Sequence, residues 1–351
     1  MEREPLKRKP NVAVVGYGYA GRCFHAYLVE LVPDMVLRGI SSRNEETRKR
    51  IEKEQAVHAY SGLEEALADP QVDLVVLATP HDTHAELAVQ VMDAGKHVVT
   101  DKVMCLNLEE ADRMIEAANR NGALLSVFHN RRWDGGYLTL KRCWESGMLG
   151  KVFHAETCWS IHGRPRGWRA ERKHGGGRLY DLGAHMIDQA VNLAGSPVRN
   201  VLCRMHRDIA EMDVESHVDC LMTFESGLTW LVQTSCLDWS PRPRWKVMGT
   251  EGTFVKTGLD PQEKAMVAGD IDSARESPEN KTRVWTVQQG VQVEMVVETI
   301  PGRWRSFYED IAAALIEGRE PAITARSVRP CIAVIDAAFR SAESGESVPV
   351  G

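Results

Sequence analysis

The stretch Asn11–Gly21, NVAVVGYGYAG, decides the fold of the first part of the chain. Its apolar run Val12–Val15 is typical of a strand buried on both faces of a parallel sheet. Gly16, Gly18 and Gly21 then follow at the GxGxxG spacing. In that pattern the first glycine permits a tight turn, the second lets a pyrophosphate approach the backbone, and the third lets the next helix pack closely. The alternative is a glycine turn with a purely structural role.

The surroundings of these glycines favour a dinucleotide site. A helix is predicted over residues 22–32, directly after the last glycine. The unpaired N–H groups and partial positive charge at its N-terminus suit a diphosphate. The chain has no GxxxxGK[ST] motif, so the turn is not a P-loop, and no GxSxG follows a strand as a serine hydrolase would require.

Composition narrows the class of protein. A chain of 351 residues is long enough for two domains, and its net charge of −6 without a long basic block argues against nucleic acid. No apolar run approaches the roughly 18 residues that cross a bilayer, and the charged N-terminus is unlike a secretory signal. The eight cysteines are scattered without a CxxC pair. We therefore expect a cytoplasmic protein with reduced thiols and no membrane partner.

Strands and helices alternate through the first part of the chain. Strands are predicted at 35–40, 72–78, 97–100 and 124–128, and helices at 44–55, 63–68, 83–95 and 109–121. This alternation predicts a doubly wound parallel Rossmann sheet with right-handed crossovers. Ligands bind beyond the carboxyl ends of such strands, where the glycine turn, Thr79-Pro80 and Asp101-Lys102 all fall.

The pattern changes near residue 127. Strands are predicted at 152–160, 198–205, 215–224, 228–236, 244–249 and 252–256, and helices at 137–146, 304–317 and 328–344. Short glycine-bearing turns between successive strands indicate a mostly antiparallel sheet. The polar stretch 260–280 is expected to be a mobile excursion. We predict an α/β protein with an NAD(P)-binding Rossmann domain at 1–126 and an α/β domain at 127–351, which carries a large open sheet.

The end of the second strand bears on which cofactor binds. Ser41-Ser42-Arg43 lies about 20 residues after the glycine turn, where an NAD site usually has an acidic residue. Residues 37–44 contain no acid, whereas the two hydroxyls and the guanidinium fork suit the 2′-phosphate of NADP. NADP is therefore predicted over NAD. The alternative is that Arg43 is solvated and pairs with the glutamates that follow it.

Two motifs carry the candidate chemistry. In GGGRLYDLGAHMID, residues 175–188, Asp181, His185 and Asp188 are spaced to share one helix face. A histidine can accept the hydroxyl proton during hydride transfer near neutral pH, and a lysine can stabilise the developing alkoxide. We predict His185 as general base, Lys102 as hydrogen-bond donor and proton relay, and Asp181 as their electrostatic partner. The alternatives are an ordinary helix pair and a surface lysine.

A metal site is the other interpretation of these donors. Together with His174, the residues Asp181, His185 and Asp188 offer nitrogen and oxygen ligands. Zinc requires a compact ligand set, and these donors are dispersed without a CxxC or HExxH motif. We therefore predict no metal.

Four segments resemble one known family. They are GYGYAG at 16–21, ATPHDTH at 78–84, AGKHVVTDK at 94–102 and GGGRLYDLGAHMID at 175–188. In this order they resemble the glucose-fructose oxidoreductase/inositol dehydrogenase/rhizopine-catabolism (Gfo/Idh/MocA) family. The segment SVFHNRRWDGGYL at 126–138, with the serines and arginine at 41–43, is most similar to its NADP-dependent scyllo-inositol dehydrogenase branch. The segment RSAESGESV at 340–348 is similar to the family's closing helix.

The resemblance implies functional residues as well as a fold. It implies that Lys102, Asp181 and His185 are catalytic and that the open sheet mediates homodimer or homotetramer contacts. Trp168 and Arg169 are candidates to line a polyol pocket, with packing and ion pairing as the alternative; Arg131 and Trp133 are weaker candidates. The cofactor contacts implied together are Gly16, Gly18, Tyr19, Ala20, Gly21, Ser41, Ser42, Arg43, Thr79, Pro80, His84, Asp101, Lys102 and Asn130.

One departure concerns the lysine motif. The family usually has Glu-Lys-Pro, whereas this chain has Asp101-Lys102-Val103. A proline restricts the residue before it, so Val103 leaves the orientation of Lys102 less constrained.

The expected activity is an NADP(H)-dependent hydride transfer between nicotinamide and a secondary hydroxyl or ketone of a cyclic polyol or sugar, such as scyllo-inositol. Two other functions remain open. One is an NAD-dependent glycoside hydrolase that retains its cofactor through turnover, and the other is a non-catalytic dinucleotide sensor.

Overall fold

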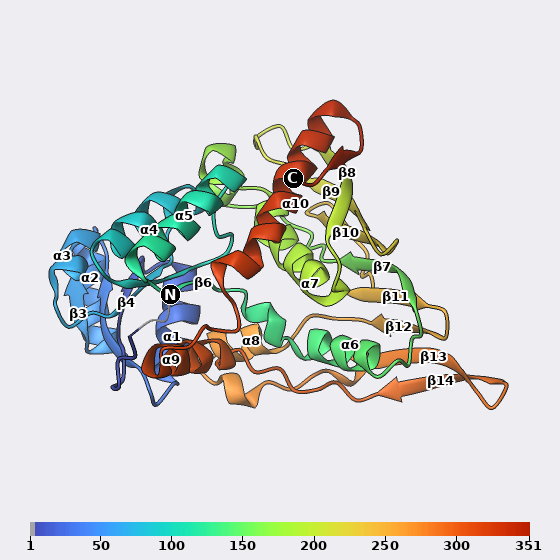
Figure 1. The fold of residues 1–351 in the computed structure, drawn as a ribbon, viewed down its shortest axis with the longest axis horizontal. Helices are drawn as coiled ribbons and strands as arrows, with labels where there is room; N and C mark the ends of the chain where they lie inside the picture. Colours follow the sequence, from blue (N-terminus) through green and yellow to red (C-terminus); the bar gives the residue numbers. More distant parts are fainter. Residues whose placement is uncertain (1–3) are drawn as a thin grey trace. The chain divides into compact units, whose positions relative to one another are not determined.

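The computed structural model describes residues 4–351, and they form two compact units (Figure 1). The first unit comprises residues 4–129 and 304–329. The second comprises residues 130–303 and 330–351. The sequence-based division at 126/127 assigned all later residues to the second domain. The structure differs from it because the chain returns to the first unit at residue 304.

The first unit is built on a six-stranded parallel sheet of order β3-β2-β1-β4-β5-β6. Its strands are β1 (Asn11–Val15), β2 (Val36–Ser41), β3 (His58–Tyr60), β4 (Leu74–Leu77), β5 (His97–Thr100) and β6 (Leu125–Val127). This strand order is that of a Rossmann fold, as the sequence predicts. The side chains of β4 are completely buried, which explains why its sequence is a continuous apolar run.

Helices cover this sheet, and Figure 1 shows α4 and α5 side by side. The helices are α1 (Tyr27–Glu30), α2 (Glu45–Gln55), α3 (Leu63–Ala68), α4 (His84–Asp93), α5 (Leu108–Asn121) and α9 (Ser306–Glu317). Asn44 and Asn107 cap α2 and α5 by accepting a backbone N–H three residues ahead, each at 2.9 Å. The predicted helix after the glycines is π-helical at Gly21–Ala26 before α1 begins.

Aromatic packing explains why α9 belongs to the first unit. The ring centroid of Phe307 lies 5.0 Å from that of Phe128, and the ring of Tyr308 lies 5.8 Å from it. Tyr308 also hydrogen-bonds to the buried His25 through its hydroxyl, at 2.6 Å. The contacts with Phe128 join residues about 180 positions apart and the bond to His25 spans 283, distances along the chain that local sequence patterns do not show.

The second unit contains a nine-stranded sheet of order β14-β13-β12-β11-β7-β10-β9-β8-β15. Its strands are β7 (Val152–Cys158), β8 (Val198–His206), β9 (His217–Phe224), β10 (Thr229–Ser235), β11 (Trp245–Gly249), β12 (Gly252–Lys256), β13 (Thr282–Gln288), β14 (Val291–Val297) and β15 (Val348–Pro349). All neighbouring strands are antiparallel except β7 and β10. The mostly antiparallel sheet is therefore confirmed.

The remaining helices are α6 (Gly135–Glu145), α7 (Ala184–Ala194), α8 (Gln262–Val267) and α10 (Ala325–Ser344). The structure adds elements that the sequence analysis did not identify. Residues 260–280, expected as an excursion, contain α8 and bury Met266 and Ile271. The strands β13 and β14, which form a hairpin at one edge of the sheet, were also missed. No helix in residues 4–351 is long and apolar enough to cross a membrane.

Candidate active site

The three glycines in the turn after β1 differ in the space around them. Gly16 has a φ of +103°, and a Cβ there would lie 2.6 Å from the carbonyl oxygen of Ala78. A Cβ at Gly21 would overlap the carbonyl oxygen of Gly16. A Cβ at Gly18, by contrast, would meet no atom within 4 Å. The first and third glycines are thus required by the packing of the turn itself, and Gly18 leaves open space where the sequence predicts a diphosphate.

The end of β2 presents a cation. Arg43 is exposed, and its guanidinium forms no ion pair among residues 4–351. The alternative partners Glu45 and Glu46 instead pair with Lys49, at 3.0 and 3.4 Å. The neighbouring Ser42 hydroxyl accepts a backbone N–H at 3.3 Å and remains partly accessible. The guanidinium is therefore available to an anionic ligand.

The end of β5 carries Asp101 and Lys102 on a buried polar network. The Asp101 carboxylate accepts the backbone N–H of Lys102 at 2.8 Å and lies 3.7 Å from the Nε2 atom of His25. Burial opposes the charge of Asp101, but the interaction with His25 outweighs it and holds the pKa of this carboxyl below its ordinary value. The opposite ring nitrogen of His25 contacts the hydroxyl of Tyr308. The backbone at Lys102 is thus tied to α9.

His84 joins two loops at the same edge of the sheet. Its Nδ1 atom lies 2.8 Å from the carbonyl oxygen of Val103, and its Nε2 atom lies 3.0 Å from that of Thr79. The hydroxyls of Thr79 and Thr83 are 2.6 Å apart, which tightens the turn at Pro80. The peptide bond between Lys102 and Val103 is cis. Both ring nitrogens of His84 thus lie at hydrogen-bond distance from backbone carbonyls. Burial lowers the pKa of His84, so the neutral ring donates to one of these two carbonyls and lies between the loops.

Two further predicted cofactor contacts differ in their surroundings. Tyr19 is 49% exposed and packs edge-on against Phe24 at 5.7 Å, with Ala20 next to it in the chain. Asn130, at the start of the second unit, is 2% exposed, and its Nδ2 atom has no acceptor among residues 4–351. An unsatisfied buried amide costs free energy, so this donor is suited to a ligand.

The motif at 175–188 forms a widened helix followed by α7. Residues Leu179–Gly183 are π-helical. The α-helical spacing from which Asp181 and His185 were predicted to share one face therefore does not apply between them. The Asp181 carboxylate lies 3.6 Å from the Nε atom of Arg169, and the Arg169 guanidinium lies 4.4 Å from the Trp168 ring. His185 is 6% exposed. The structure therefore brings Trp168, Arg169 and Asp181 together, an association that their spacing in the sequence did not show.

Asp188 has a different role from the one its spacing suggests. Its two carboxylate oxygens accept from Nε and Nη2 of Arg132 at 2.8 and 2.6 Å, and Asp188 is 2% exposed. Although burial lowers the pKa of Arg132, the charge and hydrogen bonds of Asp188 raise it above the ordinary value. Within residues 4–351, no three His, Cys, Asp or Glu side chains are grouped as metal ligands. Asp188 is thus a structural ion-pair partner that joins α7 to the segment around Arg132.

Trp159 is the centre of a cluster that the sequence analysis missed. Its ring is stacked with His185, with centroids 6.0 Å apart. The Cζ atoms of Arg131 and Arg244 lie 4.3 and 5.3 Å from the indole centroid. Gln189 links the two arginines, since it donates to the Arg131 carbonyl at 2.7 Å and accepts from Arg244 at 3.0 Å. Of these residues the sequence analysis considered Arg131 and His185 but not Trp159, Gln189 or Arg244, because no local motif connects positions so far apart in the sequence.

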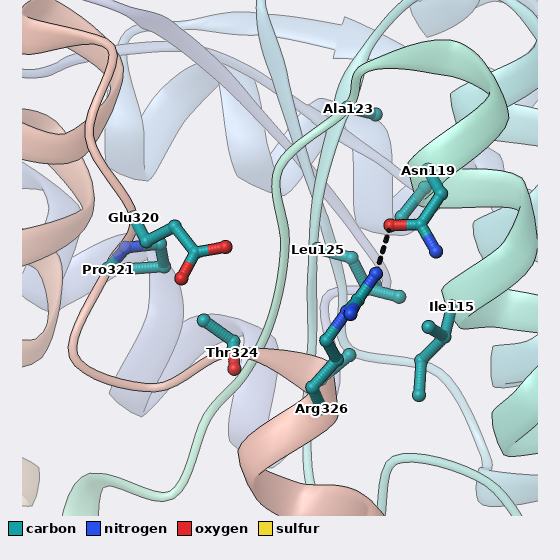
Figure 2. A pocket seen from close by; sticks show the side chains of 10 residues that line it. Ile115, Asn119, Ala123, Leu125, Glu320, Pro321, Thr324 and Arg326 are labelled. Atoms are coloured by element: carbon teal, nitrogen blue, oxygen red, sulfur yellow. Dashed lines mark hydrogen bonds between the residues drawn. The ribbon is translucent and has the colours of Figure 1, made fainter. Parts of the chain in front are cut away.

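A small pocket lies elsewhere in the first unit. Figure 2 shows it between α5 and the segment that leads into α10, where Arg326 donates to Asn119 at 2.8 Å. Its volume is about 60 Å³, and none of the predicted site residues lines it. It is therefore not the candidate active site.

The fold and the glycine turn together define a dinucleotide-binding oxidoreductase class. Residues 10–129 match an oxidoreductase family with an NAD-binding Rossmann fold, and residues 137–255 match the GFO/IDH/MocA C-terminal domain. The chain therefore belongs to the Gfo/Idh/MocA family of oxidoreductases. It is an NAD(P)-dependent dehydrogenase with inositol dehydrogenases among its relatives.

Relatives of this chain carry names that state different cofactors. The chain is 31% identical to the scyllo-inositol 2-dehydrogenase (NADP(+)) IolW of Bacillus subtilis, over 96% of this chain and 95% of that protein. It is 28% identical to a scyllo-inositol 2-dehydrogenase (NAD(+)) of the same organism, over 79% and 82% of the two chains. The solved structure of yvaA from Bacillus subtilis matches with a TM-score of 0.90 at 28% identity and covers 98% of this chain and 99% of its own.

Proposed function

We propose that this protein is an NADP(H)-dependent dehydrogenase of a cyclic polyol or sugar. The observation that carries the cofactor choice is the exposed Arg43 guanidinium without an ion pair among residues 4–351, next to the Ser42 hydroxyl at the end of β2. A 2′-phosphate would supply the missing counter-charge, whereas a ribose 2′-hydroxyl would not. The similarity to a scyllo-inositol 2-dehydrogenase (NADP(+)) supports both the cofactor and the polyol class.

A bound nicotinamide would supply the acceptor for the hydride of the reacting carbinol carbon. His185 accepts the proton of the reacting hydroxyl. Loss of this proton together with the hydride converts the neutral alcohol to a neutral ketone. Lys102 donates a hydrogen bond to the same oxygen and stabilises its developing negative charge. Asp181 acts as the electrostatic partner of these groups. Trp168 and Arg169 bind the substrate, with Asp181 oriented by its ion pair to Arg169.

Cofactor titration followed by a polyol panel tests this function. We expect NADP⁺ to bind at least tenfold more tightly than NAD⁺. We expect Arg43→Ala to weaken NADP⁺ by about tenfold, the value of one charge-assisted contact of about 1.4 kcal/mol, without changing NAD⁺. Lys49→Ala, which removes another exposed cation from the same segment, is the control and should change neither affinity. Tighter NAD⁺ binding by the wild-type protein would refute the cofactor assignment.

Turnover tests the catalytic residues. Lys102→Ala and His185→Ala should each lose activity on scyllo-inositol, myo-inositol or a related sugar while binding NADP⁺ as before. Near-wild-type turnover in both variants would refute their roles. Glycoside cleavage without accumulation of reduced cofactor would identify a hydrolase instead, and firm NADP⁺ binding with no turnover of any polyol would identify a sensor.

The nine-stranded sheet is also the proposed site of self-association. Light scattering of the purified protein should give the mass of a dimer or a tetramer, and a monomer at micromolar concentration would contradict this proposal.

A further inference from the structure

The second unit contains a cavity that the predicted site residues do not account for. Its volume is about 400 Å³, and it lies between the end of β7, the segment that precedes β11, and the segment that follows β12. Its wall includes Trp159, Ser160, Arg242, Arg244 and Asn280. No Asp or Glu is among the residues that line it.

Arg244 is a buried cation without a carboxylate partner. It is 5% exposed, and no carboxylate in residues 4–351 lies within ion-pair distance of its guanidinium, although the charge of Asp134 acts on it from farther away. Its Nη2 atom donates to Gln189, whereas its Nη1 atom is buried with no acceptor in the described chain. Burial lowers the pKa of Arg244 to about 10, so it remains positively charged at neutral pH. A buried charge of this kind destabilises the fold unless an anion compensates it.

A second cation and a second orphaned donor belong to the same wall. Arg242 is exposed and forms no close ion pair among residues 4–351, although its charge acts on the nearby Asp238 carboxylate. Trp159 is 5% exposed, and its Nε1 atom is buried without an acceptor in the described residues. The cavity wall therefore combines two guanidiniums that form no close ion pair in the described residues with two buried N–H donors, on Arg244 and Trp159, that have no acceptor there.

Trp159 relates this cavity to the candidate catalytic residues. The same indole that lines the cavity is stacked with His185. A molecule in the cavity would thus contact the aromatic ring that positions the proposed general base. The indole also offers an apolar face to the C–H groups of a sugar ring, and Ser160 and Asn280 offer hydroxyl and amide groups to its hydroxyls.

We propose that this cavity binds an anionic oxygen group carried by the substrate, so that among polyols and sugars the preferred substrate is a sugar acid or a sugar phosphate. The proposal rests on the proposed function, because it assigns the substrate class of the same site. Arg244 compensates its buried charge by binding the oxyanion, and Arg242 adds a second contact at the solvent side. Carboxylates and phosphate esters share this chemistry, since both present paired oxygens to a guanidinium.

Matched ligands that differ only at carbon 6 test the proposal. Calorimetric titration of the NADP⁺-loaded protein would compare D-glucose, D-glucuronate and D-glucose 6-phosphate, and the corresponding galactose, galacturonate and galactose 6-phosphate. At least one anionic member should bind tenfold or more tightly than its neutral counterpart. Preference for the glucuronate or galacturonate would identify a carboxylate site, and preference for the phosphate would identify a phosphate site. No binding of any anionic member would overturn the proposal.

Variants assign the effect to the arginines. Arg244→Gln should abolish the preference for the anion, Arg244→Lys should retain part of it, and the exposed Arg242→Gln should weaken anion binding about threefold without a risk to folding. Arg283→Gln, which removes an exposed arginine from β13, is the control and should leave the affinities unchanged. An undiminished preference in both Arg244→Gln and Arg242→Gln would overturn the assignment.

The same experiment separates the two proposals. Turnover of an inositol without binding of any anion would leave the dehydrogenase function intact and refute the anionic site. Binding of an anion without oxidation of any ligand would do the reverse.

Discussion

Replacement of Asp188 by asparagine should destabilise the second unit more than any exposed ion-pair substitution. Asp188 and the side chain of Arg132 are both almost completely buried, and two hydrogen bonds of 2.8 and 2.6 Å connect them. The new amide would retain one acceptor oxygen, but the negative charge would be lost. The Arg132 guanidinium would then be a buried cation without a counter-charge.

The size of the effect follows from that uncompensated charge. Breaking a buried ion pair from one side costs about 3–5 kcal/mol, and the retained amide oxygen places the expected loss near 3 kcal/mol. For a unit of roughly 200 residues, each kcal/mol lowers the melting temperature by about 2–4 °C. Asp188→Asn should therefore lower the melting temperature of the second unit by about 6–12 °C.

Scanning calorimetry and urea unfolding measure this loss. Asp336→Asn is the matched control, since it removes a carboxylate from a half-exposed ion pair with Arg340 on α10 and should cost under about 1 kcal/mol. The double variant Arg132→Met/Asp188→Leu should recover most of the stability, because no buried charge remains. A loss below about 2 °C for Asp188→Asn, or a double variant as unstable as the single one, would refute the reasoning.

Three further predictions concern the turn, a titrating pair and the lysine support. Gly21→Ala places a methyl group on the carbonyl of Gly16 and should cost roughly 1–3 kcal/mol, with weaker NADP⁺ binding, as measured by thermal unfolding and titration. The hydrogen bond and charge of Asp219 raise the pKa of His217, so the ion pair contributes fully to stability below about pH 6.5, and this contribution is lost as the pH rises through the folded-state pKa. His217→Gln should therefore reduce the pH dependence of the urea midpoint between pH 6 and pH 8. An unchanged pH dependence would contradict this prediction. Asp101→Asn removes the charge opposite the buried His25 and should displace Lys102. We expect kcat to fall roughly 10- to 100-fold, with little change in NADP⁺ affinity. A kcat equal to that of the wild-type protein would show that Asp101 does not position Lys102.

The predictions that succeeded rest on local patterns. The run Val12–Val15 and the glycines after it predicted a strand, a turn and a helix, because burial on both faces and close backbone approach restrict residue types at neighbouring positions. The predicted boundaries of β5 agree with the structure. The strand β3 was missed because three residues are too few to show a periodic pattern. The hairpin β13–β14 was missed although Val291, Val293 and Met295 alternate with polar residues along β14.

The site shows the same division. Residue type and spacing alone indicated the glycine turn, the Ser42-Arg43 pair and the candidate residues Lys102 and His185. They did not show that Asp188 is engaged by a buried arginine, because that contact crosses 56 positions of the chain.

The amino-acid sequence by itself determined that this chain forms a Rossmann domain followed by a mostly antiparallel sheet, and it identified the family. Only the tertiary structure showed that α9 belongs to the first unit. It also showed that the Trp159 ring contacts both His185 and Arg244, and that Arg244 donates a hydrogen bond to Gln189. The physical reason is the range of the interactions. Periodicity and turn chemistry act between residues a few positions apart, whereas buried charges and aromatic contacts join side chains that only the folded chain brings together.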